Sequence, residues 1–137
     1  MRIVPLKPED YPDLIQLWKD AGFTIGRSEE QAEVEKFLHH NPETSLGLFI
    51  GERLVGSVLG GYDGRRALIH HLAVISDQQG NGYGRALMSE VEKRLMKRGV
   101  VKISFWVKSD NKRVISFYEK EGFHVRDDLL TMSKQLL

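Results

Sequence analysis

A glycine-rich stretch, Gln79-Gly80-Asn81-Gly82-Tyr83-Gly84, lies between an apolar run over residues 68–75 and an amphipathic segment that reaches Arg98. If the chain passes here from a strand into a helix, the backbone N–H groups of the loop and of the first helical turn face a common hollow. The helix dipole adds partial positive charge at the same place. The pattern therefore indicates an anion site, which we interpret as a site for a diphosphate. A flexible turn at the start of a helix is the alternative.

Composition excludes several kinds of chemistry. The chain contains no cysteine, which rules out disulfides, thiolate nucleophiles and cysteine metal sites. Its 20 basic and 19 acidic residues give a formal net charge of +1, so charge favours neither nucleic-acid nor membrane binding. No set of His, Asp and Glu has metal-ligand spacing, and we expect no metal. Without a membrane-spanning run or a signal peptide, a cytoplasmic location is the default expectation.

The elements that must position the glycine loop can be predicted from apolar periodicity and from helix and turn signals. Residues 2–6 form the expected first strand, and two helices follow that end at Gly22 and before Asn41-Pro42. The apolar faces of these helices comprise Leu14, Leu17, Trp18 and Ala21 in the first and Val34, Phe37 and Leu38 in the second.

Strands dominate the middle of the chain, and a turn at Gly51-Glu52 predicts a hairpin there. The expected strands up to the loop cover residues 46–50, 54–59 and 67–75. The elements after it are a helix ending at Gly99, a strand over 100–107, a helix capped by Ser109, Asp110 or Asn111, and closing strands at 123–125 and 129–136.

The resulting order is β-α-α-β-β-β-α-β-α-β-β, without a linker or an internal repeat. A chain of 137 residues is long enough for a proper core, and we expect a single domain over residues 1–137. The predicted fold class is α/β (α+β), with a single mixed, mostly antiparallel sheet of six to seven strands and about four helices on both faces.

Two motifs and the element order closely resemble the GNAT superfamily of acetyl-CoA-dependent N-acetyltransferases. The first motif is His71-Leu72-Ala73-Val74 with the glycine loop after it, and the second is Asn111 with Tyr118 seven positions on. The element order extends the likeness over essentially the whole chain, which also resembles small stand-alone bacterial members and ribosomal-protein alanine acetyltransferases. It implies the GNAT fold, in which the fourth and fifth strands splay apart.

The resemblance also implies a coenzyme A site. Backbone N–H groups from Gly80 through Arg85 would hold the diphosphate, with the Gln79 side chain shaping the loop. The backbone of Leu72 and Val74 would pair with the pantetheine arm like an added strand, while their side chains are ordinary core residues. The complete set of residues that the resemblance assigns to coenzyme A binding is Leu72, Ala73, Val74, Gln79, Gly80, Asn81, Gly82, Tyr83, Gly84, Arg85, Asn111, Phe117 and Tyr118.

Tyr118 has the family role of a general acid that returns a proton to the departing thiolate of coenzyme A. The alternative is a core tyrosine with a satisfied hydroxyl. Asn111 has two compatible roles, as a helix cap and as a contact of the pantetheine arm.

The general base is less well defined, because the strand before the loop carries two histidines and no carboxylate. Successive strand residues point to opposite faces, so we expect only one of the rings of His70 and His71 to face the cleft. His70 shares the parity of Leu72 and Val74 and is the first candidate, with His71 the second; Glu119 and Asp63 are outside candidates. A structural histidine, or a base that acts through a water chain, is the alternative.

These features predict direct transfer of an acetyl group from acetyl-CoA to a primary amine, either a small amine or a peptide N-terminus. The alternative is a non-catalytic acyl-CoA-binding sensor on the same fold. Partners would be the acceptor alone, without nucleic acid or membrane, in a monomer or homodimer. Aromatic residues that line an acceptor pocket, or belong to the core, are Trp18, Phe23, Tyr62, Phe105 and Trp106.

Overall fold

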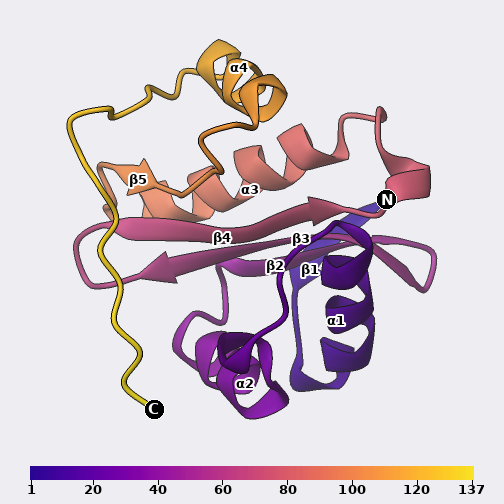
Figure 1. Ribbon diagram of the computed structural model, residues 1–137. Coiled ribbons are helices and arrows are strands. Elements are labelled where there is room, and N and C mark those ends of the chain that lie inside the picture. The colour runs from indigo at the N-terminus through magenta and orange to yellow at the C-terminus, as the bar shows by residue number, and fades with distance from the viewer. The chain divides into compact units, whose positions relative to one another are not determined.

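A mixed sheet of five strands organises residues 1–105 (Figure 1). The computed structural model describes all residues from 1 to 137 and divides into two units, Met1–Phe105 and Trp106–Leu137. The strands lie in sequence order, and neighbours are antiparallel except for the parallel pair β4 and β5. Their bounds are β1 Arg2–Pro5, β2 Ser45–Ile50, β3 Arg53–Tyr62, β4 Ala67–Val74 and β5 Ile103–Ser104. The predicted mixed, mostly antiparallel sheet is confirmed, with five strands in place of six or seven.

Three helices cover the two faces of this sheet. α1 (Tyr11–Asp20) and α2 (Gln31–His40) pack on one face, and α3 (Tyr83–Lys97) packs on the other (Figure 1). Two adjacent glycines in β3 mark the two sides. A Cβ atom at Gly60 would meet Val91 of α3 at 2.9 Å, whereas one at Gly61 would meet Phe37 of α2 at 3.2 Å. The missing side chains let both helical layers approach the sheet closely.

The apolar helix faces predicted from the sequence form the core. In α1, Leu14, Leu17 and Trp18 are at most 1% exposed. The buried residues of α3 are Leu87, Met88, Val91 and Leu95. Three short 3-10 turns, η1 (Pro8–Asp10), η2 (Arg27–Glu29) and η3 (Ser76–Gln78), connect these elements. None of the helices combines the length and the apolar character that a membrane span needs.

β4 contains a β-bulge that the sequence did not predict. Ser57 of β3 pairs with Ala73, but Leu59 pairs with His70, so one residue of β3 faces two residues of β4. The two residues in the bulge are His71 and Leu72. His71 has φ +49°, and it is the only non-glycine residue of the chain with a positive φ. A bulge of this kind turns a strand locally and changes which way its side chains point.

β4 and β5 pair over only two residues, Ala67 with Ile103 and Leu68 with Ser104. Beyond Leu68, β4 continues to Val74 without further pairing to β5. The fourth and fifth strands therefore separate, as the resemblance implies, and β5 is much shorter than the predicted strand over residues 100–107.

The second unit, Trp106–Leu137, contains α4 (Lys112–Lys120) and no strand. The predicted closing strands at 123–125 and 129–136 are therefore wrong in this structure. Their alternating apolar residues remain largely exposed: Leu129 at 60%, Met132 at 95% and Leu136 at 83%. Alternation in a sequence indicates a half-buried strand, but a strand also needs a paired neighbour for its backbone groups, and local sequence does not specify that neighbour.

Candidate active site

The glycine loop has the conformation of an anion-binding turn. Gly80 and Gly82 have φ values of +85° and +78°, and no atom lies within 4 Å of where a Cβ would stand at either position. α3 begins at Tyr83, no side chain caps its first turn, and that turn contains no acidic residue. Its first N–H groups have no acceptor within the helix. These N–H groups and the positive end of the helix dipole therefore suit an anion such as a diphosphate.

Hydrogen bonds from neighbouring elements fix the loop. The carboxylate of Asp20, at the end of α1, accepts bonds from the N–H and the hydroxyl of Ser76 at 2.7 and 3.0 Å. Arg53 at the start of β3 contacts Asp77 at 2.8 Å, and its guanidinium lowers the pKa of that carboxyl. The Gln79 side chain donates to the Val74 carbonyl at 3.0 Å. The approach to α3 is thus held by α1, by β3 and by the end of β4.

The outer edge of β4 presents backbone groups next to this loop. The Ile75 N–H donates to the Val55 carbonyl at 2.8 Å, and Ala73 pairs with Ser57. Alternate residues of an antiparallel ladder turn their backbone groups to the same neighbour. The backbone groups of Ala73 therefore point to β3, whereas those of Leu72 and Val74 point to the opposite edge, where the Val74 carbonyl also accepts the Gln79 amide. β5 does not pair with that edge beyond Leu68, so an extended chain can pair there.

A chain of two hydrogen bonds, made by the buried side chains of Trp18 and Ser57, holds the bulge in β4. The indole Nε1–H of Trp18 donates to the hydroxyl oxygen of Ser57 at 3.0 Å. The Ser57 hydroxyl donates in turn to the His71 carbonyl at 2.8 Å. Trp18 and Ser57 are both 0% exposed, so water does not compete for these bonds.

Both histidines of β4 lie on the face covered by α1 and α2. The His71 ring packs on Trp18 and Phe23, with centroids 4.2 and 5.0 Å apart. The His70 ring meets Phe37 of α2 edge-on at 5.8 Å. The prediction that the two rings point to opposite faces is therefore wrong. The bulge is the physical reason, since the positive φ of His71 breaks the alternation on which that prediction rested.

The structure places a carboxylate beside His71 that sequence reasoning missed. Oε1 of Glu29, in η2, lies 3.6 Å from His71 Nε2, and both side chains are largely buried. Oε2 of Glu29 accepts the Gly26 N–H at 3.3 Å, and the Tyr11 hydroxyl donates to the Glu29 carbonyl at 2.8 Å. No spacing in the sequence connects Glu29 with β4, because only the packing of η2 on the sheet brings them together.

Burial controls the charge of the two imidazoles. Burial lowers the pKa of His71, the Glu29 carboxylate opposes this shift, and the neighbouring His70 lowers the pKa further. Burial also lowers the pKa of His70. Nδ1 of His71 is buried without a hydrogen-bond partner. Both rings are therefore predominantly neutral at pH 7, in the form that can accept a proton.

In the second unit, Tyr118 lies on α4 between two aromatic rings. Phe117 and Phe123 meet its ring edge-on at 5.1 and 5.6 Å. Burial raises the pKa of Tyr118 to about 12, so the phenol keeps its proton at neutral pH. The Asn111 side chain accepts the Val114 N–H at 3.3 Å, which confirms its role as a helix cap.

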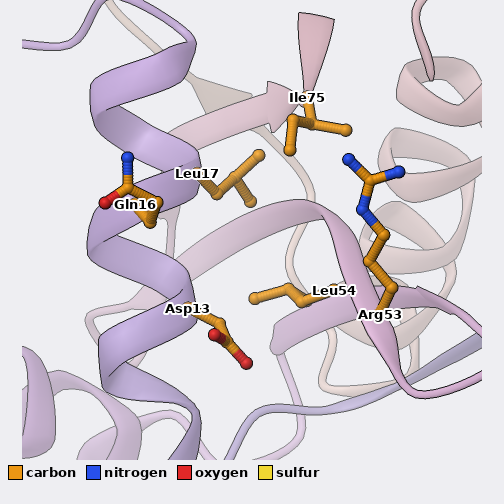
Figure 2. A pocket seen from close by; sticks show the side chains of 6 residues that line it. All are labelled: Asp13, Gln16, Leu17, Arg53, Leu54 and Ile75. Carbon is orange, nitrogen blue, oxygen red and sulfur yellow. The ribbon is translucent and has the colours of Figure 1, made fainter. Parts of the chain in front are cut away.

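A separate hollow of about 250 Å³ lies between α1 and the ends of β3 and β4 (Figure 2). Asp13 and Gln16 of α1 lie on one side of it and Arg53 on the other. Its floor is apolar and consists of Leu17, Leu54 and Ile75. None of the predicted site residues lines this hollow.

Comparison with known proteins defines the class to which this fold and site belong. A sequence model of the Acetyltransferase (GNAT) family matches residues 11–123. An acetyltransferase from Sodalis glossinidius is 35% identical over 137 residues, which cover 100% of this chain and 96% of that protein. An acetyltransferase from Pectobacterium atrosepticum has the same identity and coverage.

Solved structures agree with this assignment. The PaiA N-acetyltransferase from Thermoplasma acidophilum, solved with coenzyme A, superposes with a TM-score of 0.83 at 22% identity and covers 92% of this chain and 91% of its own. The ribosomal-protein-alanine N-acetyltransferase from Escherichia coli superposes with a TM-score of 0.74 at 26% identity. The match covers 90% of this chain and 77% of that protein. The chain belongs to the GNAT family of acetyltransferases. It is accordingly an acyltransferase enzyme.

Proposed function

We propose that this chain transfers the acetyl group of acetyl-CoA directly to a primary amine. The observation that carries the proposal is the open edge of β4, which leads into the uncapped start of α3. Bound acetyl-CoA supplies a thioester carbonyl that an amine can attack. Backbone N–H groups of Gly80 through Arg85 hold the diphosphate, and Leu72 and Val74 pair with the pantetheine arm. The Leu72 N–H stabilises the oxyanion as it forms.

The acceptor amine loses its proton to a histidine of β4. His71 has the support of Glu29, whose negative charge strengthens the imidazole as a base. His70 remains the other candidate, since burial also keeps its ring neutral. The variants His70→Gln and His71→Gln separate the two, because only the base variant loses its turnover and the acidic limb of its pH profile.

Tyr118 supplies the proton that the departing thiolate needs. A phenol whose pKa is about 12 keeps its proton throughout the neutral range. It is a weaker acid than a thiol, so it gives the proton up only as negative charge develops on sulfur. The family resemblance also assigns contacts of coenzyme A to Asn111, the N-cap of α4, and to Phe117 within that helix. A single domain over residues 1–137 is supported by the family match, which includes parts of both units.

The acceptor is a small amine or a peptide N-terminus. The fold shared with the ribosomal-protein-alanine acetyltransferase supports the peptide. A cytoplasmic location and a monomeric or homodimeric state stay predictions.

Thiol release from acetyl-CoA tests the proposal. Because the chain has no cysteine, every thiol that a disulfide reagent detects comes from coenzyme A. We expect release with at least one member of a panel of small amines and short peptides, and none without an acceptor. If acetyl-CoA binds but no acceptor causes release of its thiol, the result would contradict the enzymatic proposal and favour an acyl-CoA sensor. Thermal stabilisation by acetyl-CoA but not by NAD or ATP measures the binding separately.

A further inference from the structure

We propose that Ser57 is a positioning residue for acetyl transfer. Its buried hydroxyl holds the His71 carbonyl, and this bond aims the Leu72 N–H at the open edge of β4. The inference rests on the proposed function, in which that N–H meets the reacting carbonyl oxygen.

The geometry of a single peptide group connects Ser57 to the site. The C=O of His71 and the N–H of Leu72 belong to the same planar peptide, and no peptide bond in the chain is cis. In a trans peptide these two groups point in opposite directions. Ser57 belongs to β3 and binds the His71 carbonyl at 2.8 Å. The Leu72 N–H therefore points away from the Ser57 hydroxyl, and its alternation with Ala73, which pairs with β3, directs it to the edge that β5 leaves beyond Leu68.

The bulge needs such a bond because its backbone is unusual. His71 has φ +49°, a conformation that residues other than glycine keep only when their surroundings hold them. At this bulge the regular ladder between β3 and β4 is interrupted. A side-chain hydroxyl therefore takes the place of the missing ladder donor for the His71 carbonyl.

Trp18 sets the direction of the Ser57 hydroxyl. The indole N–H occupies a lone pair of the hydroxyl oxygen at 3.0 Å, which leaves the hydroxyl proton for the His71 carbonyl. The same indole packs on the His71 ring at 4.2 Å. One fully buried tryptophan thus holds the side chain of His71 directly and its carbonyl through Ser57.

A matched control separates positioning from ordinary stability. Ser45 of β2 is also 0% exposed, and its hydroxyl also donates to a backbone carbonyl, that of Asn41 at 2.7 Å. Ser57→Ala and Ser45→Ala therefore remove the same group from the same kind of environment. We expect kcat to fall about ten-fold or more in Ser57→Ala and to stay within about two-fold in Ser45→Ala. The Kd of free coenzyme A should change by less than about three-fold in both, because free coenzyme A lacks the acetyl carbonyl that the Leu72 N–H meets and the diphosphate loop keeps its own contacts.

A second pair covers the case in which Ser57→Ala does not fold. Ser57→Thr and Ser57→Val have nearly the same shape and differ by a hydroxyl against a methyl. The threonine variant should keep most of the turnover and the valine variant should lose it. Equal kcat values within the threonine–valine pair, or within the two alanine variants, would overturn the inference.

A spectroscopic readout decides the inference without turnover. In ¹⁵N–¹H spectra, acetyl-CoA should shift the Leu72 amide resonance of the wild type and of Ser45→Ala, and should shift it much less in Ser57→Ala. The same shift in all three proteins would overturn the positioning role. A wild type that releases no thiol with any amine contradicts the proposed function instead, and the amide shifts still test Ser57.

Discussion

His71 Nε2 and Glu29 Oε1 lie 3.6 Å apart, although the two residues belong to a strand of the sheet and to a 3-10 turn that packs on it. The carboxylate is held by Gly26 through its other oxygen, and the imidazole is held between Trp18 and Phe23. A fixed carboxylate beside a buried imidazole forms a pair that can receive a proton from an ammonium group.

Replacing the carboxylate should weaken this pair. Glu29→Gln keeps an oxygen for the Gly26 N–H but removes the negative charge that raises the pKa of His71. We expect kcat to fall about ten-fold at pH 7 and the acidic limb of the rate profile to move to lower pH. The rate profile and an NMR titration of the His71 ring measure both effects. Glu30→Gln, at an exposed neighbouring carboxylate, is the control; equal activity of the two variants would exclude Glu29 from the chemistry.

Stability should fall as the medium is acidified below pH 6.5. Burial lowers the pKa of His70 and His71 below the ordinary value of 6.5. Between 6.5 and the lower folded-state values, the unfolded chain binds more protons than the folded chain, so the free energy of unfolding decreases with falling pH. Urea unfolding at pH 7.5 and 5.5 measures the difference. His71→Gln should reduce the difference in the free energy of unfolding between the two pH values, whereas replacing the exposed His124 should not. Equal stability at both values would contradict the burial of neutral imidazoles.

The hydroxyl of Tyr118 should affect turnover and leave donor binding intact. Tyr118→Phe removes the proton donor but keeps the ring between Phe117 and Phe123. We expect kcat to fall about 100-fold, with the Kd of coenzyme A nearly unchanged. Because the pKa of Tyr118 is about 12, loss of its proton should not reduce the rate between pH 7 and 10. Full turnover in Tyr118→Phe would end the assignment.

Binding at the glycine loop should be sensitive to a single methyl group. Gly82→Ala places a Cβ where no protein atom lies within 4 Å, so its cost to folding is the strain of φ +78°, about 1 kcal/mol. The same methyl group occupies the space that the diphosphate needs, and the Kd of coenzyme A should rise at least about ten-fold. Gly64→Ala carries the same kind of strain at φ +100° in an equally open turn. Calorimetric titration should find weaker binding only in Gly82→Ala; unchanged binding there would remove the diphosphate from this loop.

The sequence by itself determined the features that depend on local chemistry. The turn at Gly51, the helix ends at Gly22 and Gly99 and the glycine loop before α3 all stand where predicted. Each of these signals depends on residues within a few positions of one another, because a left-handed turn or an apolar helix face is a property of the local chain.

Tertiary structure alone decided how the candidate site is built. The bulge at His71 arises because β4 has one residue more than β3 between two paired positions, and no local sequence signal indicates this extra residue. Glu29 reaches His71, and Ser57 reaches the His71 carbonyl, only because the packed layers bring distant segments together. For the same reason the apolar alternation of residues 129–136 did not ensure a strand. Hydrogen bonds between strands and contacts across layers join residues that lie far apart in the chain. Only the packing of the whole chain determines which of these residues come into contact.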